Sequence, residues 1–264
     1  MARPWIRAAG TAVVALTLAS ACTGASRPLA ISRAAPAESP TTTVTAAPTT
    51  TSAIPPVPVT TSPPPAVAAA PPTTAARVWQ PRVVHDTAWS PFAQVAGVVL
   101  HHPSTRVERV GFHESHPDGA QALDPMPTAA APTTLESRKR GTAPRSAADI
   151  VSDPGADIRS PVTGTVKRAG RYVLYCKYSD DFAVIEPDAR PGWEVKLLHI
   201  TSVQVRAGDR VVAGETLLAL RPTQLPFESQ VDEDRTSDPA WPHVHLEVVD
   251  PTIKDRPSPG GGCS

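Results

Sequence analysis

Two histidines near the C-terminus have a spacing that suits metal or acid–base chemistry. His243 and His245 flank Val244 within an apolar run. If this run is a β-strand, alternate side chains share a face, so both imidazoles point the same way. There they could address one metal ion and its bound water. Two half-exposed strand histidines would show the same pattern, so the interpretation needs support from other residues.

The segment that must position these histidines has the pattern of an antiparallel β domain. From about residue 147 to 251 the apolar runs are short, rich in β-branched residues and bounded by Gly, Pro or Asp. They cover 162–166, 172–178, 182–186, 193–200, 211–212, 216–220 and 244–249. Helical apolar stripes of useful length are missing. The predicted fold class is all-β, an antiparallel sandwich or partly open barrel.

Five ordered features between about residues 145 and 250 resemble the LytM/lysostaphin family of murein zinc endopeptidases. They are Asp149, SPVTGTV (160–166), LLHI (197–200), VRAGDRVVAGE (205–215) and HVHLEV (243–248). The resemblance implies that His245 and Asp149 bind zinc. It also implies that His199 and His243 are catalytic histidines that orient the nucleophile and stabilise the oxyanion.

One position departs from the family's pattern. Four residues before the aspartate, where the family has its first histidine ligand, this chain has Arg145. Arginine stays protonated and offers no lone pair, so we expect Arg145 to form a bidentate ion pair with Asp149 instead. Asp149 and His245 would then be an incomplete set, because catalytic zinc typically has three protein ligands. The sequence predicts that zinc binds weakly or not at all.

The remaining histidines lie outside these motifs. His113 and His116 occur in FHESH, His101 and His102 precede a proline, and His85 has no motif around it. None lies at a distance along the sequence from Asp149 that is typical of zinc ligands. FHESH is also not the zinc-binding helix motif HExxH. Exposed loop histidines are therefore the favoured interpretation; the alternative is that His113, His116, His101 or His102 completes the zinc site.

The N-terminal region has the composition of an export signal followed by a spacer. Residues 1–21 place Arg3 and Arg7 before a short apolar stretch, which is typical of a signal peptide. Cys22 follows small residues in a sequence that resembles a bacterial lipobox, which implies lipidation; ordinary cleavage beside an incidental cysteine is the alternative. Residues 22–78 are mostly Ala, Pro, Thr and Ser and predict a disordered linker. We expect an exported protein held at the cell membrane by its lipid, facing the cell wall.

The rest of the chain divides into three predicted parts. Residues 79–136 form a short extension with a β-hairpin, whose strands 95–100 and 107–112 join through residues 102–104. Residues 137–255 form the LytM-like β domain, and 256–264 a flexible tail. Cys176 and Cys263 could pair as a disulfide in an oxidising compartment.

These predictions favour a cell-envelope lipoprotein that binds peptidoglycan or regulates a murein hydrolase, without full peptidase activity. One alternative is an active zinc metalloendopeptidase that cleaves peptidoglycan crosslinks. A second is a non-enzymatic β-barrel adaptor, because residues 160–166 and 208–214 also resemble lipoyl and biotinyl carrier domains. A carrier needs a lysine in a hairpin turn, which Lys167, Lys177 and Lys196 do not provide. Zero net charge and scattered basic residues argue against a nucleic-acid partner.

Overall fold

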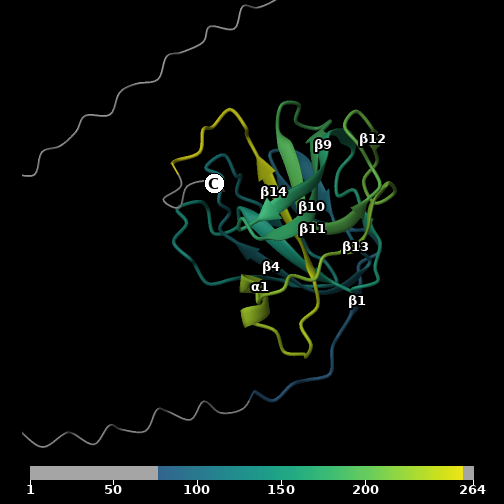
Figure 1. The fold of residues 1–264 in the computed structure, drawn as a ribbon, viewed down its shortest axis with the longest axis vertical. Coiled ribbons are helices and arrows are strands. Elements are labelled where there is room, and N and C mark those ends of the chain that lie inside the picture. Colours follow the sequence, from purple (N-terminus) through teal and green to yellow (C-terminus); the bar gives the residue numbers. More distant parts are fainter. Residues whose placement is uncertain (1–76, 258–264) are drawn as a thin grey trace, which may run out of the picture. The chain divides into compact units, whose positions relative to one another are not determined.

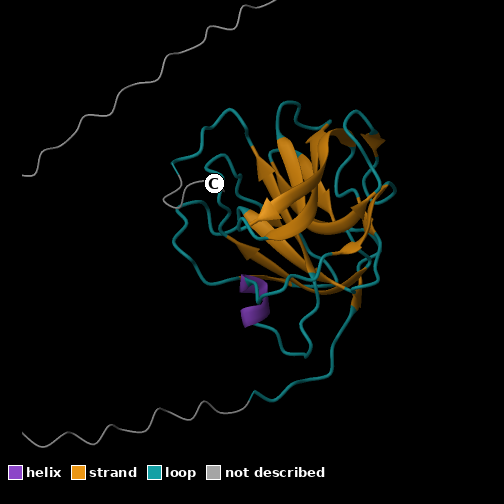
Figure 2. Ribbon diagram, viewed as in Figure 1, coloured by secondary structure: helices purple, strands orange, loops and turns teal. Residues whose placement is uncertain are grey.

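The computed structural model describes residues 77–257, whose regular secondary structure consists of β-strands and one short helix joined by loops (Figures 1 and 2). Strand pairing is antiparallel apart from the pair β4–β6, and one short helix, α1 (Gln230–Glu233), interrupts the strands of this part. The predicted all-β antiparallel class is confirmed. None of the described helices is long and apolar enough to cross a bilayer. The predicted signal peptide, Cys22, nearly all of the linker, and Cys263 lie outside the described residues.

The strands form two sheets. The larger has the order β1-β4-β7-β14-β11-β10-β9-β12, with β6 paired to β4, β13 to β11 and β8 to β13; the smaller has the order β3-β2-β5. The bounds in the larger sheet are β1 (His85–Asp86), β4 (Arg106–His113), β6 (Pro132–Thr134), β7 (Ala147–Ser152), β8 (Ile158–Arg159), β9 (Gly164–Leu174), β10 (Tyr178–Pro187), β11 (Glu194–Val203), β12 (Arg210–Val211), β13 (Leu217–Pro222) and β14 (His243–Val249). The bounds in the smaller are β2 (Pro91–Val95), β3 (Val98–His101) and β5 (Asp124–Pro125).

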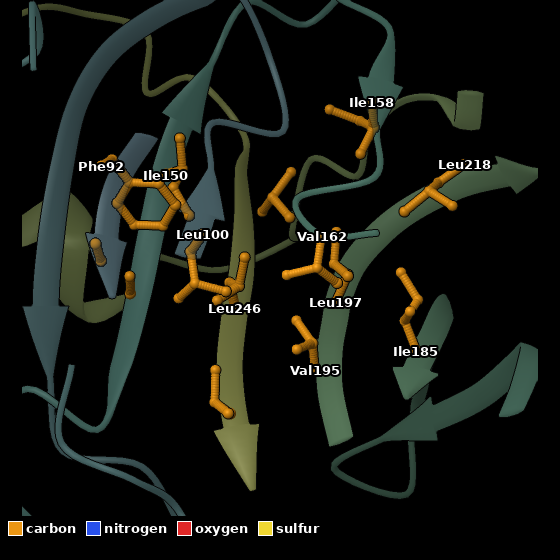
Figure 3. Close-up of a cluster of buried hydrophobic side chains, with 14 of the residues drawn as sticks. Phe92, Leu100, Ile150, Ile158, Val162, Ile185, Val195, Leu197, Leu218 and Leu246 are labelled. Carbon is orange, nitrogen blue, oxygen red and sulfur yellow. The ribbon is translucent and has the colours of Figure 1, made fainter. Parts of the chain in front are cut away.

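A shared hydrophobic core joins the two sheets. Phe92 and Leu100 of the smaller sheet belong to the same buried cluster as Ile150 and Leu246 of the larger (Figure 3). Each of these four side chains is fully buried, and burial of such a side chain contributes about 1.5–3 kcal/mol. The strands β7 and β14 are therefore held firmly on one face. Their other face carries a second, small cluster of Leu135, Val151 and Val231, and polar side chains beside it.

On the three neighbouring strands β4, β7 and β14, core-facing side chains alternate with side chains that face the site. Near the site, the even-numbered residues of these strands enter the hydrophobic core, as Phe112 of β4, Ile150 of β7 and Leu246 of β14 do. The odd-numbered residues beside them point to the opposite face, because successive side chains of a strand alternate. His113 and His245 are among these odd-numbered residues. The residues that must enter the core therefore determine which polar side chains lie together on the opposite face.

The predicted hairpin in the extension is wrong. Residues 95–100 do not form one strand, because the chain turns at Ala96 and Gly97, which have φ values of 45° and 85°. Two central residues with positive φ make a tight hairpin turn, and here it pairs β2 with β3. β4 belongs instead to the larger sheet, where it pairs with β7. The extension therefore completes the sheet that carries Asp149.

Two other features differ from the sequence predictions. β7 was not predicted as a strand, although all six of its residues are buried and it lies between β4 and β14. The predicted strand 172–178 contains the turn between β9 and β10, where Tyr175 and Cys176 have positive φ. Cys176 is disulfide-bonded.

Candidate functional site

Three polar residues meet on the face of the larger sheet opposite the main hydrophobic core, one from each of three adjacent strands. His245 of β14 lies directly opposite Asp149 of β7, and Gly111 of β4 lies opposite Asp149 on the other side. His113 is two residues beyond Gly111, so its side chain is on the same face. The site is therefore assembled by strand pairing between segments that are far apart in the sequence.

The distances within this group fit a metal site. His113 Nε2 is 3.1 Å and His245 Nδ1 is 2.8 Å from Asp149 Oδ1, and the three potential ligand atoms all lie within 4.8 Å of one another. Ligand atoms around a tetrahedral zinc are about 3.3 Å apart when each is about 2.0–2.1 Å from the ion. His113 and Asp149 are buried, and His245 is nearly so. The group could hold a metal ion.

The hydrogen bonding of His113 leaves one nitrogen ready for a ligand role. Its Nδ1 lies 2.8 Å from the Glu114 carbonyl oxygen, which can only accept, so Nδ1 carries the proton. The Nε2 atom then has a lone pair, is buried, and makes no hydrogen bond to any described residue. Nε2 and Asp149 Oδ1 face each other across 3.1 Å. A cation bound between the two atoms would be a partner for both.

His245 is held between two carboxylates. Its Nδ1 faces Asp149 and its Nε2 lies 3.6 Å from Glu247 Oε2. Burial opposes charge on this ring, but the hydrogen bonds to Asp149 and Glu247 outweigh burial and raise the pKa of His245 to about 9. A proton thus occupies the position that a metal would take. In many metal sites an outer carboxylate binds one ring nitrogen of a histidine and so orients the other ring nitrogen toward the metal. Glu247 and His245 have this arrangement.

The carboxylate of Glu247 is itself anchored. It accepts a hydrogen bond from Ser115 Oγ and forms an ion pair with Lys196 Nζ at 3.2 Å. Burial opposes its charge, and His245 and Lys196 nevertheless lower the pKa of Glu247 to about 2. A carboxylate that stays ionised fixes the tautomer of His245 with Nε2 protonated and Nδ1 directed to the site.

A second histidine, His199 of β11, is fixed by an aspartate. Asp180 Oδ2 lies 2.6 Å from His199 Nδ1 and accepts a further hydrogen bond from Tyr172 Oη at 2.7 Å. Nδ1 of His199 therefore donates, which leaves Nε2 as the basic atom. The backbone of His199 has φ 61°, a left-handed conformation that is uncommon outside glycine and asparagine. Strain of this kind concentrates at functional sites, where the surrounding structure holds it.

His243 completes the group of histidines. Its ring centroid is 5.0 Å from that of His199, and its Nε2 is 3.7 Å from Asp149 Oδ2. Burial lowers the pKa of His243 to about 4, and the neighbouring His199 and His245 act in the same direction. His243 is therefore neutral at pH 7 and can donate one hydrogen bond from its ring.

These residues line a cleft of about 290 Å³. The cleft contains both the pair His199–His243 and the candidate metal-binding group, which consists of His113, Asp149 and His245 and is called the metal-binding group below. One wall comes from the loop between β13 and β14, through Leu225 and residues 227–230. This connection runs from residue 223 to residue 242, and loops of this length often border binding sites.

The predicted site residues have mixed outcomes. Asp149, His199, His243 and His245 are brought together, as the sequence predicts. The interpretation of His113 as an exposed loop histidine is wrong, because His113 ends β4 and is 4% exposed. The same interpretation is wrong for His102, which is fully buried, and for His85 and His101, which lie in β1 and β3. These three do not line the cleft, whereas His116 does.

The expected ion pair between Arg145 and Asp149 is absent from the described residues. Arg145 is exposed in the turn before β7 and donates from Nε to the Leu123 carbonyl oxygen at 3.3 Å. His113 joins Asp149 and His245 in a group that could hold a metal ion, so the structure offers a third candidate ligand beside the two that the sequence motifs contain. The sequence pattern did not favour His113, because its place beside Asp149 depends on strand pairing and not on spacing along the chain.

We expect Arg145→His to leave metal binding unchanged. The exposed turn at residue 145 is not part of the group formed by His113, Asp149 and His245. Zinc titration of the two proteins, followed by elemental analysis, should give equal stoichiometry and dissociation constants that agree within about twofold. A tenfold gain in affinity for the variant would show that residue 145 belongs to the metal site after all.

Sequence reasoning missed Asp180, Tyr172 and Glu247. Asp180 and Tyr172 lie on the paired strands β10 and β9, directly opposite each other in register. The pairing of these strands brings Asp180 and Tyr172 to His199. The apolar pattern could not show this, because it predicted a single strand over residues 172–178. Glu247 lies two residues after His245, so its position on the same strand face could have been inferred from the alternation alone.

Comparison with known proteins adds no assignment. No family model matches the chain. No curated protein matches it either. The resemblance to the LytM/lysostaphin family therefore rests on the motifs in this sequence.

Proposed function

We propose that the protein is a zinc metalloendopeptidase that cleaves peptide crosslinks in bacterial murein. The observation that carries this proposal is the complete group His113, Asp149 and His245 beside the pair His199–His243 in one cleft. Two histidines and one carboxylate form a ligand set found in catalytic zinc sites, which keep a further position open. The reason for expecting reduced activity was a missing third ligand, and His113 fills that place.

The three residues are of types that bind zinc, and their potential ligand atoms are also available to bind it. The buried Nε2 of His113 has no hydrogen-bond partner among the described residues, and both histidines have their other ring nitrogen tied to an acceptor. His113 Nε2, Asp149 Oδ1 and His245 Nδ1 would hold the ion. When bound, zinc polarises a carbonyl group and lowers the pKa of a water molecule.

The remaining polar groups can move protons around the scissile amide. His199 has its Nδ1–H tied to Asp180, so its Nε2 can accept a proton from the attacking water and later pass it to the leaving amine. His243 is neutral at pH 7 and can donate a hydrogen bond to the oxygen on which negative charge develops. Burial and the Asp180 carboxylate raise the pKa of Tyr172, so its hydroxyl remains a donor that holds Asp180.

The choice of murein as substrate rests on the motifs that resemble the LytM/lysostaphin family, and on the predicted export signal and linker. The cleft is open at the surface and is bordered by aromatic and charged side chains, which suits a peptide. A lipid anchor at Cys22 would place the domain next to the cell wall. Peptidoglycan is thus the proposed partner, and the membrane the proposed point of attachment.

The test is zinc-dependent release of crosslinked muropeptides. The purified full chain should bind one zinc per molecule and cut murein crosslinks. Chelation should abolish cleavage, and added zinc should restore it. Zinc at about 1,000 times its dissociation constant should also stabilise the fold by about 4 kcal/mol, measured as a shift in thermal unfolding. Stoichiometric zinc together with murein binding but no cleavage would support the non-catalytic alternative, and absence of zinc binding would contradict the proposal.

A further inference from the structure

Two arginines line the cleft. They are Arg138 and Arg140, and the rings of Tyr172, Tyr175 and Phe227 line it as well. The Nη1 atom of Arg140 lies 3.4 Å from Nδ1 of His113. A positive charge therefore lies beside a proposed zinc ligand.

The guanidinium of Arg140 is held in place without being neutralised by contact. Its Nη1 donates to the Glu114 carbonyl oxygen at 2.6 Å, and its backbone N–H donates to Glu114 Oε2 at 2.8 Å. Within residues 77–257 Arg140 forms no ion pair with a carboxylate. A half-buried cation that lacks such a partner and faces a cleft favours an anionic ligand.

The nearest carboxylate, that of Glu114, interacts with the Arg140 charge, but its two oxygens accept hydrogen bonds from the Arg140 backbone N–H and from Ser137 Oγ and none from the guanidinium. Arg138 pairs with Glu233, but both side chains are about half exposed, and exposed ion pairs are weak enough to exchange partners. The acidic residue Glu228, which also lines the cleft, is engaged by Arg235. A carboxylate from a ligand could therefore reach Arg140, and Arg138 could turn to the same group.

We propose that Arg140, together with Arg138, forms a subsite for a carboxylate of the peptide substrate, close to the scissile amide. The proposal rests on the peptidase function and specifies its substrate class as an acidic peptide. A guanidinium binds a carboxylate through two parallel hydrogen bonds, which an amide in the same place cannot match. The enzyme should therefore discriminate between crosslinks that have free carboxylates and the same crosslinks in amidated form.

The test compares two substrates and three variants. The substrates are purified crosslinked muropeptides with free carboxylates and the same molecules with these groups converted to amides. The zinc-loaded full chain should prefer the free acid by about 10–100-fold in kcat/KM, the range expected for a charge-assisted pair. Arg140→Gln should lose that preference by slowing cleavage of the acid, while cleavage of the amide stays within about threefold.

The other two variants separate charge, geometry and folding. Arg140→Lys keeps the charge but not the planar fork, so it should retain part of the preference. Arg206→Gln removes an arginine whose side chain is 89% exposed and which does not line the cleft, so it should behave as wild type. Zinc content and thermal unfolding of each variant show whether the fold and the metal site are intact.

The outcomes distinguish this proposal from the proposed function. Cleavage of both substrates with equal kcat/KM by the wild type would overturn the carboxylate subsite and leave the peptidase function standing. A preference for the acid that persists in folded Arg140→Gln would also overturn it. Cleavage of neither substrate by the zinc-loaded protein would overturn the peptidase function, and the subsite with it.

Discussion

Replacing His113 by alanine is expected to remove zinc from the protein and to abolish cleavage of murein crosslinks. His113 is the ligand that the sequence motifs do not contain, and its buried Nε2 makes no hydrogen bond within the described chain. Binding free energies of structural zinc are about 10–16 kcal/mol for four ligands, so one ligand is worth roughly 3–4 kcal/mol. The dissociation constant for zinc should rise about 10²–10³-fold, and kcat/KM should fall by at least as much.

The measurement is zinc titration against a competing chelator, followed by the muropeptide assay. His85→Ala is the matched control, because His85 lies in β1 outside the cleft and should leave both quantities unchanged. The variant's fold is checked by thermal unfolding without zinc, where it should remain cooperative. Stoichiometric zinc with near wild-type affinity in His113→Ala would show that the metal, if bound, does not use this residue.

Replacing His199 is expected to slow catalysis while leaving zinc in place. His199 is absent from the metal-binding group and has its Nδ1 tied to Asp180, so its loss removes a proton carrier and not a ligand. General acid–base groups typically contribute about 10²–10⁴-fold to the rate, and kcat should fall within this range. Asparagine is the better substitute, because residue 199 has φ 61°, a region that asparagine adopts more readily than alanine.

Single-turnover cleavage and zinc content should be measured on the same preparation. Asp180→Asn is the companion variant: it keeps the shape of the side chain but removes the charge that holds the Nδ1–H tautomer. It should lower kcat less than His199→Asn and shift the pH profile of kcat. A normal kcat in His199→Asn, or loss of zinc from it, would contradict the role assigned to His199.

The all-β class and much of the site could be predicted from local pattern. Short runs rich in β-branched residues indicate strands wherever side chains alternate, and most predicted runs fall within β10, β11, β13 and β14. The alternation also places His243 and His245 on one face without any knowledge of the fold. Asp149 was identified only through a resemblance, because β7 is buried throughout and shows no alternation of polar and apolar residues.

Only the tertiary structure brings His113 next to Asp149 and His245, in a group that could hold a metal ion. In a sheet, the neighbours of Asp149 are the residues across from it on β4 and β14, and their positions in the sequence depend on strand order and register. His113 therefore has no fixed spacing from Asp149, whereas Arg145 has the spacing of a family motif but lies in an exposed turn. Motif spacing describes contacts within a segment. Contacts between segments follow from hydrogen-bond pairing and burial, which exist only in the folded chain.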